Sequence, residues 1–192
     1  MASPTPVDFA GFIARIAREL SELRVPFMLI GGQAVLLHGQ PRLTEDIDIT
    51  LGVDPSRLSV VEEACALLGL DPLPSDPAGF VRETFVLPTR DRATGVRVDF
   101  IFSTTPYERQ AIDRAVLVPL GDVSVPFATA EDLIIHKLFA GRPRDEEDAV
   151  GVVRRQGSRI DWAYVERWVG EFAQVPGHED LVHRAARLKG MD

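Results

Sequence analysis

The spacing of apolar residues predicts that the chain changes from mixed α/β structure to helices alone. Residues 8–23 carry apolar side chains three or four positions apart, which predicts an amphipathic helix with Asp8 as its N-cap. The same reasoning predicts strands over residues 25–30, 46–53, 80–87 and 96–102, two short strands within 116–127, and helices over residues 33–38, 57–70 and 106–114. From residue 129 the spacing is helical, over 129–141, 143–157 and 161–173, with a short tail from 178. We therefore expect an α+β fold, with an α/β core at residues 1–128 and a helical C-terminal region at 129–192 that completes a cleft.

Two connections are predicted by their turn residues. The Pro-rich segment 71–79 is expected to be a loop, and residues 89–95 are expected to turn between two strands and form a hairpin.

The composition of the chain excludes several classes of protein. The chain has 192 residues, of which 45% are apolar, so it can bury a substantial core. It has no apolar run of membrane-spanning length and no signal-peptide core, so we expect a cytoplasmic protein without membrane contact. Cys65 is the only cysteine, which excludes an intramolecular disulfide. The net charge of −8 disfavours nonspecific nucleic-acid binding over the whole surface.

Carboxylates stand inside two of the predicted strands. Asp46 and Asp48 are two positions apart and therefore share one face of their strand, while Ile47 and Ile49 face the other way. Two carboxylates that close repel each other unless a cation lies between them or one is protonated. Asp99, on a later predicted strand, is a candidate third member of the cluster. An all-oxygen set of this kind suits Mg²⁺ or Mn²⁺.

A glycine pair lies where a predicted strand meets a short helix. Gly31 and Gly32 allow unusual backbone torsions and close approach of a ligand. The N-terminus of the helix that follows offers free N–H groups and a positive dipole end to a phosphate. Together with the carboxylates, this turn predicts a site that holds a metal-bound triphosphate from two sides.

The order of these motifs resembles the nucleotidyltransferase superfamily built on the DNA polymerase beta palm. The shared features are Gly31-Gly32, then Asp46-Ile47-Asp48-Ile49, then Asp99 in RVDFIF. Within that superfamily, GGQAVLLHGQPRLTEDIDI and EDLIIHKLFAGRPRDEEDA resemble the AbiEii-type toxin nucleotidyltransferases and their bacterial relatives. The resemblance spans about residues 27–148. It implies a polymerase beta-like core with a mixed sheet.

One departure from the family pattern concerns phosphate binding. Many members have a serine after the first glycine, whereas this chain has Gly32 followed by Gln33. The backbone cradle is retained, and Gln33 either points at phosphate or begins the helix.

Further candidates flank the acidic motif and follow it in the second half. Arg42 and Thr44 either contact phosphate or acceptor, or shape the loop before the strand. The resemblance implies that Lys137, one of only two lysines, faces the nucleotide; its alternative is a favourable charge at a helix C-terminus. A charged motif of Arg142, Arg144, Asp145 and Asp148 follows, and it is either part of the site or a surface network.

These observations predict metal-dependent transfer of a nucleoside monophosphate from an NTP to an acceptor hydroxyl, with release of pyrophosphate. Asp46, Asp48 and Asp99 would hold the metals, and Asp99 would serve the metal near the attacking hydroxyl. The resemblance implies tRNA or a protein as acceptor and a cognate antitoxin as partner. Two alternatives stay open: an aminoglycoside or lincosamide nucleotidyltransferase, and a catalytically silent domain that binds a nucleotide or a partner.

Overall fold

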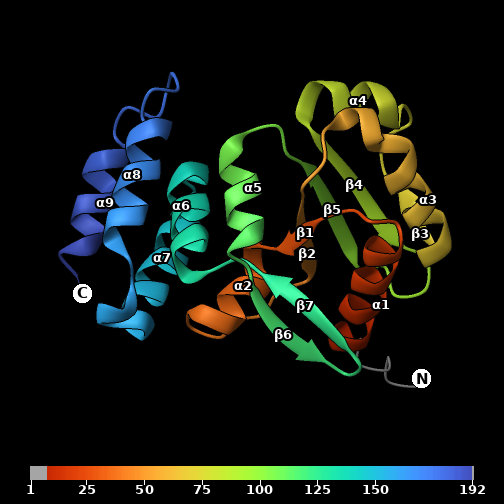
Figure 1. Cartoon of the computed structure of the whole chain (residues 1–192), viewed down its shortest axis with the longest axis horizontal. Coiled ribbons are helices and arrows are strands. Elements are labelled where there is room, and N and C mark those ends of the chain that lie inside the picture. Colours follow the sequence, from red (N-terminus) through yellow and green to blue (C-terminus); the bar gives the residue numbers. More distant parts are fainter. Residues whose placement is uncertain (1–7, 192) are drawn as a thin grey trace.

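A mixed seven-stranded sheet organises the described part of the chain, residues 8–191 of a computed structural model (Figure 1). The strands are β1 (Phe27–Leu29), β2 (Asp46–Leu51), β3 (Leu70–Pro72), β4 (Val86–Asp91), β5 (Arg97–Phe102), β6 (Val116–Leu120) and β7 (Val123–Phe127). Their order in the sheet is β3-β4-β5-β2-β1-β7-β6. The pairs β2–β5 and β1–β7 are parallel, and the other neighbours are antiparallel. This arrangement confirms the expected α+β class.

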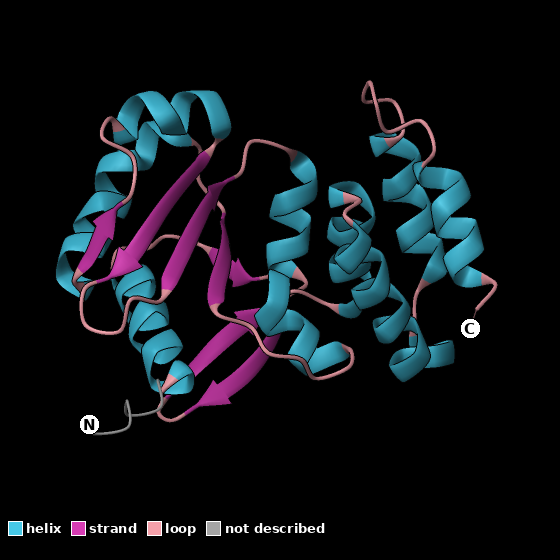
Figure 2. Cartoon of the chain, turned by 180° about the vertical axis from the view of Figure 1, so that it is seen from behind, coloured by secondary structure: helices cyan, strands magenta, loops and turns pink. Residues whose placement is uncertain are grey.

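Helices cover the sheet and extend beyond it. They are α1 (Phe9–Glu22), α2 (Gly31–His38), α3 (Leu58–Leu68), α4 (Pro77–Thr84), α5 (Pro106–Asp113), α6 (Ala130–Ala140), α7 (Pro143–Gln156), α8 (Trp162–Phe172) and α9 (Leu181–Lys189). Figure 2 shows α6 to α9 gathered beyond one side of the sheet, with the C-terminus among them and α1, α3 and α4 at the opposite side. Among the described residues, no helix is both long and apolar enough to cross a membrane.

The apolar residues that the sequence pattern predicts to face inward form the buried core. In α1 the apolar stripe is buried, and the Asp8 side chain caps the helix by accepting a hydrogen bond from the Gly11 N–H at 2.9 Å. In β2 the side chains of Ile47, Ile49 and Leu51 are fully buried, as the alternation predicts. The two short strands expected within 116–127 form and pair as β6 and β7, and a hairpin forms before β5, although its first strand, β4, begins later than predicted.

The segment after α3 corrects two predictions. Residues 71–79 are not simply a loop, because β3 ends at Pro72 and α4 begins at Pro77. The strand predicted over residues 80–87 is wrong, since α4 continues to Thr84 and β4 begins only at Val86. The physical reason is a good helix start: Asp76 accepts a hydrogen bond from the Gly79 N–H, and Pro77 occupies the first turn. Phe85, in a left-handed conformation with φ of 59°, then ends the helix.

Two boundaries differ from the prediction in ways that matter for the site. Helix α2 begins at Gly31 rather than at residue 33, so the glycines are its first turn. Strand β4 continues into the first three positions of the predicted turn, to Asp91, and carries Arg90 beside Arg97 of β5. Both changes bring backbone or charge closer to the carboxylates of β2.

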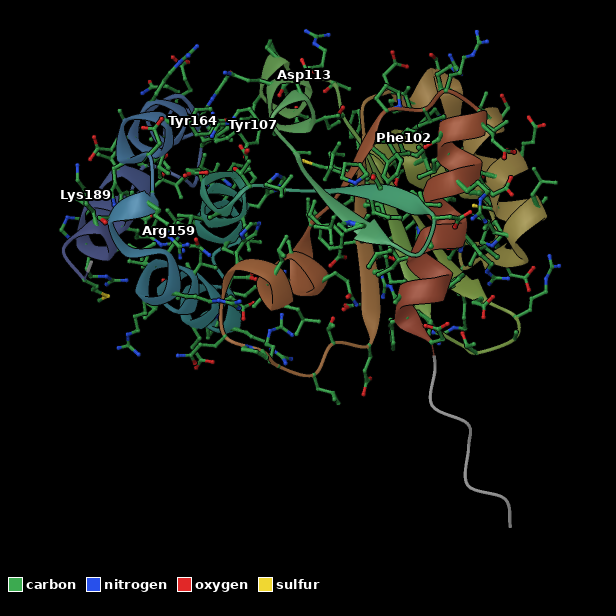
Figure 3. All side chains as sticks on the ribbon, turned by 60° about the horizontal axis from the view of Figure 1, so that its bottom comes forward. Phe102, Tyr107, Asp113, Arg159, Tyr164 and Lys189 are labelled. Atoms are coloured by element: carbon green, nitrogen blue, oxygen red, sulfur yellow. The ribbon has the colours of Figure 1, made fainter. Side chains whose placement is uncertain are left out.

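Aromatic side chains pack between α5, which precedes residue 128, and α8 of the C-terminal helices. Tyr107 of α5 lies against Trp168 and Phe172 of α8, with ring centroids 5.1 and 5.0 Å apart. Figure 3 shows Tyr107 and Tyr164 between these helices. A continuous group of buried apolar residues includes members from both sides of residue 128. The division into regions 1–128 and 129–192 stays a prediction.

Candidate functional site

The parallel pairing of β2 and β5 places the predicted carboxylates side by side. The register sets Asp48 directly opposite Asp99, and Asp46 opposite Arg97. Asp46, Asp48 and Asp99 share one face of the sheet because side chains two positions apart point the same way. A pattern read from two distant segments thus becomes one acidic cluster.

The turn from β1 into α2 lies against this cluster. Gly31 has a φ of 61°, and a side chain there would collide with Asp48 Oδ2. A side chain at Gly32 would collide with Thr44 Oγ1. Ile30, the N-cap of α2, makes no side-chain capping hydrogen bond. The uncapped N–H groups of the first turn of α2 therefore lie close to the carboxylates.

Asp48 has the most perturbed acidity of the cluster. Burial, followed by the negative charges of Asp46 and Asp99, raises the pKa of Asp48 to about 6. The positive charges of Lys137 and Arg142 offset part of this rise. The site thus has an excess of negative charge at Asp48, and a divalent cation would relieve it.

The other two carboxylates are engaged by neighbours. Asp46 Oδ1 accepts a hydrogen bond from the Thr44 hydroxyl at 3.0 Å, and Asp99 Oδ1 accepts one from Arg97 Nε at 2.8 Å. As they stand, no three carboxylate, imidazole or thiolate side chains within residues 8–191 are grouped closely enough to hold a metal ion. The donor set fits Mg²⁺ or Mn²⁺ in its chemistry, and Asp46 and Asp99 would have to turn from their present partners to complete it.

A cleft of about 840 Å³ opens over this cluster. Its walls come from the α2 turn, the loop before β2, the β4–β5 hairpin and the junction of α6 with α7. The acidic residues that line it are Glu45, Asp46, Asp48 and Asp145, and the basic ones are Arg42, Arg90, Arg97, Lys137, Arg142 and Arg144. The cleft therefore combines a carboxylate cluster with a surround of cationic side chains, as a site for a metal-bound polyphosphate requires.

A chain of ion pairs joins the loop before β2 to α6 and α7. Arg42 donates two hydrogen bonds to Asp148, at 2.8 and 3.0 Å. Lys137 Nζ lies 2.7 Å from Asp145 Oδ1 and 2.9 Å from Asp148 Oδ2. Arg142 Nε lies 2.6 Å from Asp145 Oδ2. Because the side chains of Lys137, Asp145 and Asp148 are each less than a tenth exposed, this network is a buried one.

The structure brings most of the predicted site residues to the cleft. Those that line it are Gly31, Gly32, Arg42, Thr44, Asp46, Asp48, Lys137, Arg142 and Asp145. Three others are not among its lining residues. Gln33 is buried, and its amide nitrogen lies 3.4 Å from the Asp46 carbonyl. Asp99 is beside Asp48 but paired with Arg97, and Asp148 holds Arg42 and Lys137 from behind.

Sequence reasoning missed two cationic residues of the cleft, Arg90 and Arg97. They face each other across the β4–β5 hairpin. The signal for Arg97 was present, because it precedes Asp99 by two positions in a strand and must share its face. Arg90 could not be found in the same way, since its segment was assigned to a turn.

Comparison with known proteins identifies the family. A family model described as "Nucleotidyl transferase AbiEii toxin, Type IV TA system" matches residues 15–150. No curated protein sequence is a significant match to the chain.

Several solved structures share the fold. The antibiotic-resistance factor ANT(2'')-Ia superposes with a TM-score of 0.58 at 15% identity, over 88% of this chain and 96% of that one. An antigenic nucleotidyltransferase-like protein from Paracoccidioides brasiliensis gives 0.54 at 16%, over 96% and 95%. The lincosamide antibiotic adenylyltransferase LnuA, with lincomycin bound, gives 0.52 at 18%, over 76% and 96%. At these identities the similarity shows a common fold.

The family match spans the glycine turn, the acidic strands and the ion-pair network together. The chain therefore belongs to the AbiEii nucleotidyl transferase toxin family of the type IV toxin–antitoxin system, and it is a nucleotidyltransferase.

Proposed function

We propose that this enzyme moves a nucleoside monophosphate from an NTP to an acceptor hydroxyl in the cleft over β2, with release of pyrophosphate and with help from divalent metal. The observation that carries the proposal is the pairing of Asp48 with Asp99 beside the uncapped turn of α2. A raised carboxylate pKa next to two further carboxylates is the electrostatic condition that a bound cation relieves.

Asp46, Asp48 and Asp99 are the residues that would hold Mg²⁺ or Mn²⁺. The chemistry supplied there would be neutralisation of charge on the triphosphate and on the attacking and leaving oxygens. Asp48 is already directed at the α2 turn, whereas Asp46 would have to give up its hydrogen bond with Thr44 and Asp99 its pair with Arg97. Arg97 would then be free to donate to a substrate oxygen.

The phosphates of the NTP would lie at the first turn of α2. The N–H groups of Gly32 and Gln33 are available there because Ile30 provides no capping oxygen. Gly31 and Gly32 let the side chains of Asp48 and Thr44 lie directly against this turn, since a side chain at either glycine would collide with them.

Lys137 and Arg142 complete the charge balance of the triphosphate. Both are paired with Asp145, which fixes their positions at the wall of the cleft. Asp148 fixes Arg42 and Lys137 in the same way. We assign Asp145 and Asp148 as positioning residues that act through these cations.

We propose that the acceptor is tRNA. The wall of the cleft carries Arg90 and Arg144, which make no ion pair with a carboxylate among residues 8–191 and can therefore meet the phosphates of a polynucleotide. The family's place in a type IV toxin–antitoxin system implies a cognate antitoxin as partner. A protein hydroxyl, an antibiotic hydroxyl and a silent nucleotide-binding domain are the outcomes against which the test discriminates.

The test incubates the purified protein with each of four α-labelled NTPs, Mg²⁺ or Mn²⁺, and total bacterial tRNA. Label should move to tRNA with the wild type and fall by at least about a hundredfold with Asp48→Asn, because lost metal stabilisation is worth several kcal/mol. Asp54→Asn is the matched control, since Asp54 is an exposed carboxylate beyond the opposite end of β2. Its activity should equal that of the wild type.

Parallel reactions contain tobramycin, lincomycin or a bacterial protein extract in place of tRNA. Label on an antibiotic or a protein, with none on tRNA, would overturn the acceptor assignment and leave nucleotidyl transfer intact. Metal-independent transfer, or full activity of Asp48→Asn, would overturn the proposed metal site. NTP binding without transfer to any acceptor would favour the silent domain.

A further inference from the structure

A second groove lies between α7 and α9 and shares no lining residue with the catalytic cleft. Its volume is about 820 Å³, within the range of small-molecule sites. Its walls are formed by α9 and the residue Met191 after it, by α7, by Leu138 of α6 and by Gln40 of the loop after α2. Nothing in the proposed transfer reaction uses this space.

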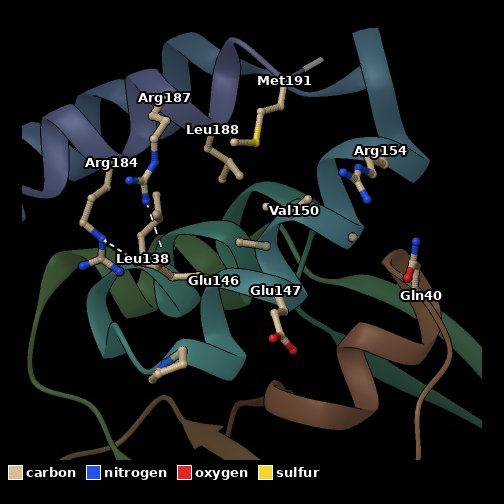
Figure 4. A pocket seen from close by; sticks show the side chains of 13 residues that line it. Gln40, Leu138, Glu146, Glu147, Val150, Arg154, Arg184, Arg187, Leu188 and Met191 are labelled. Atoms are coloured by element: carbon tan, nitrogen blue, oxygen red, sulfur yellow. Dashed lines mark ion pairs between the residues drawn. The ribbon is translucent and has the colours of Figure 1, made fainter.

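The lining combines apolar side chains with three arginines and with two glutamates, Glu146 and Glu147. Figure 4 shows Leu188 and Met191 above the groove and Val150 below it, with Arg184 and Arg187 reaching from α9 toward α7. Arg154 lies at the other end. Three guanidinium groups against two carboxylates leave this lining positive in a chain with a net charge of −8, which favours a ligand with an anionic head and an apolar body.

The arginines are poorly satisfied by the chain itself. Arg184 Nε lies 3.4 Å from Glu146 Oε1, and Arg187 Nη2 lies 3.6 Å from Glu146 Oε2. These contacts are long beside the 2.6–2.9 Å ion pairs in the wall of the catalytic cleft. Nε and Nη2 of Arg184 are buried and make no hydrogen bond within residues 8–191. An anion at this place would supply the acceptors that these donors lack.

The groove and the catalytic cleft lie on opposite sides of the same segments of the chain. On α6, Lys137 lines the cleft and Leu138 the groove; on α7, Asp145 lines the cleft and Glu146 the groove. The loop after α2 divides in the same way, with Gln40 on one side and Arg42 on the other. Any ligand in the groove therefore touches the far side of the segments that hold the buried ion-pair network.

We infer that this groove is a binding site for a small amphiphilic anion, with its carboxylate or phosphate head on Arg184 and Arg187 and its apolar body on Val150, Leu188 and Met191. The head competes with Glu146 for both guanidinium groups and so releases the first turns of α7 from α9. Asp145 adjoins Glu146 and holds Lys137 and Arg142. Occupancy of the groove therefore changes the rigidity of the cleft wall formed at the junction of α6 with α7. Binding itself does not depend on the proposed transfer reaction.

The binding test is a calorimetric titration of the full chain with decanoate and with decyl phosphate, both below their micelle concentrations, and with decanol as the uncharged control. One equivalent of an anion should bind at least about tenfold more tightly than decanol. Arg187→Gln, at an exposed side chain, should weaken binding without disturbing the fold, and Arg184→Gln/Arg187→Gln should weaken it further. Lys189→Gln is the matched control, because Lys189 is a cation of α9 outside the groove, and its affinity should equal that of the wild type.

Decanoate and decyl phosphate separate the two possible head groups, and tighter binding of either identifies the preferred one. Equal binding of decanol, no saturable binding, or an equal loss in Lys189→Gln would overturn the site. Coupling is read by hydrogen exchange: amides 144–150 of α7 should change rate by about threefold on saturation, while those of α3 stay constant. Saturation that leaves the α7 amides unchanged would overturn the coupling.

Discussion

The ionised Asp48 carboxylate destabilises the folded state at neutral pH. Its pKa is raised from 3.8 to about 6, mainly by burial and then by Asp46 and Asp99. Because the folded-state pKa lies above the unfolded value, the stability linked to this group is fully present below about pH 4 and is lost as pH rises through 6. Without metal, Asp48→Asn should therefore raise the free energy of unfolding at pH 7.5, by at most about 3 kcal/mol.

The measurement is urea unfolding of wild type and Asp48→Asn in EDTA at pH 4 and pH 7.5. The gain should be confined to the higher pH, since Asp48 is protonated at pH 4 in the folded state. Mg²⁺ should then stabilise the wild type and leave Asp48→Asn unchanged. An equal effect of the substitution at both pH values would show that the charge of Asp48 is not the cause.

At the scale of elements, the approach of α2 to β2 depends on glycine for two separate reasons. Gly31 has a positive φ, and it also leaves no room for a side chain beside Asp48. Gly69, which ends α3, has a similar φ of 76°, and a Cβ added there would meet no other atom within 4 Å. Gly69→Ala should cost about 1 kcal/mol for the left-handed backbone alone, and Gly31→Ala should cost at least about 1 kcal/mol more.

Thermal unfolding of both variants under identical conditions separates the two costs. The collision at Gly31 should also displace Asp48, so Gly31→Ala should abolish any Mg²⁺-dependent rise in the melting temperature while Gly69→Ala keeps it. Equal destabilisation by the two alanines would mean that α2 can move away from β2 without loss.

Elements with a strong period were predictable from the sequence, and those that depend on local capping were less so. The alternation in β2 and β5 and the helical spacing of α1, α6 and α7 placed these elements within a few residues. Helix α4 is hard to predict because the prolines of residues 71–79 are typical of a loop, although Asp76 before Pro77 is also a helix start. Phe80 and Phe85 are both partly exposed, so these apolar residues do not mark one buried face of a helix. The segment therefore lacks the apolar spacing from which a helix is predicted.

The candidate site was predictable where its residues belong to one strand or one turn. Asp46 and Asp48 follow from the two-residue repeat, and Asp99 joins them once β2 and β5 pair in parallel. The partners of Arg42 could not be predicted, because Asp148 is 106 positions away and only the tertiary fold brings the two together. For the same reason the sequence could not show that Lys137 is buried between two carboxylates.

At the scale of the whole molecule, Lys137 is the centre of a charge network that ties α6 and α7 to the loop before β2. Burial disfavours ionisation of Asp145 and Asp148, but hydrogen bonds from Lys137, Arg42 and Arg142 outweigh it and hold the pKa of both below its usual value. Lys137→Met should leave these carboxylates with too little positive charge and cost about 3 kcal/mol at pH 7. Lys189→Met is the matched control, since the chain's other lysine forms an exposed pair with Glu166, and its cost should stay within about 0.5 kcal/mol.

The pH dependence distinguishes lost charge pairing from lost packing in Lys137→Met. Depressed carboxylate pKa values contribute stability that is present above about pH 4 and is lost as pH falls through the lowered folded-state values. The difference in unfolding free energy between wild type and Lys137→Met should therefore be largest at pH 7 and shrink in acid. A difference that stays constant down to pH 3 would assign the loss to packing of the lysine side chain. The ion pairs of Lys137 would then contribute nothing to the stability of the junction between α6 and α7.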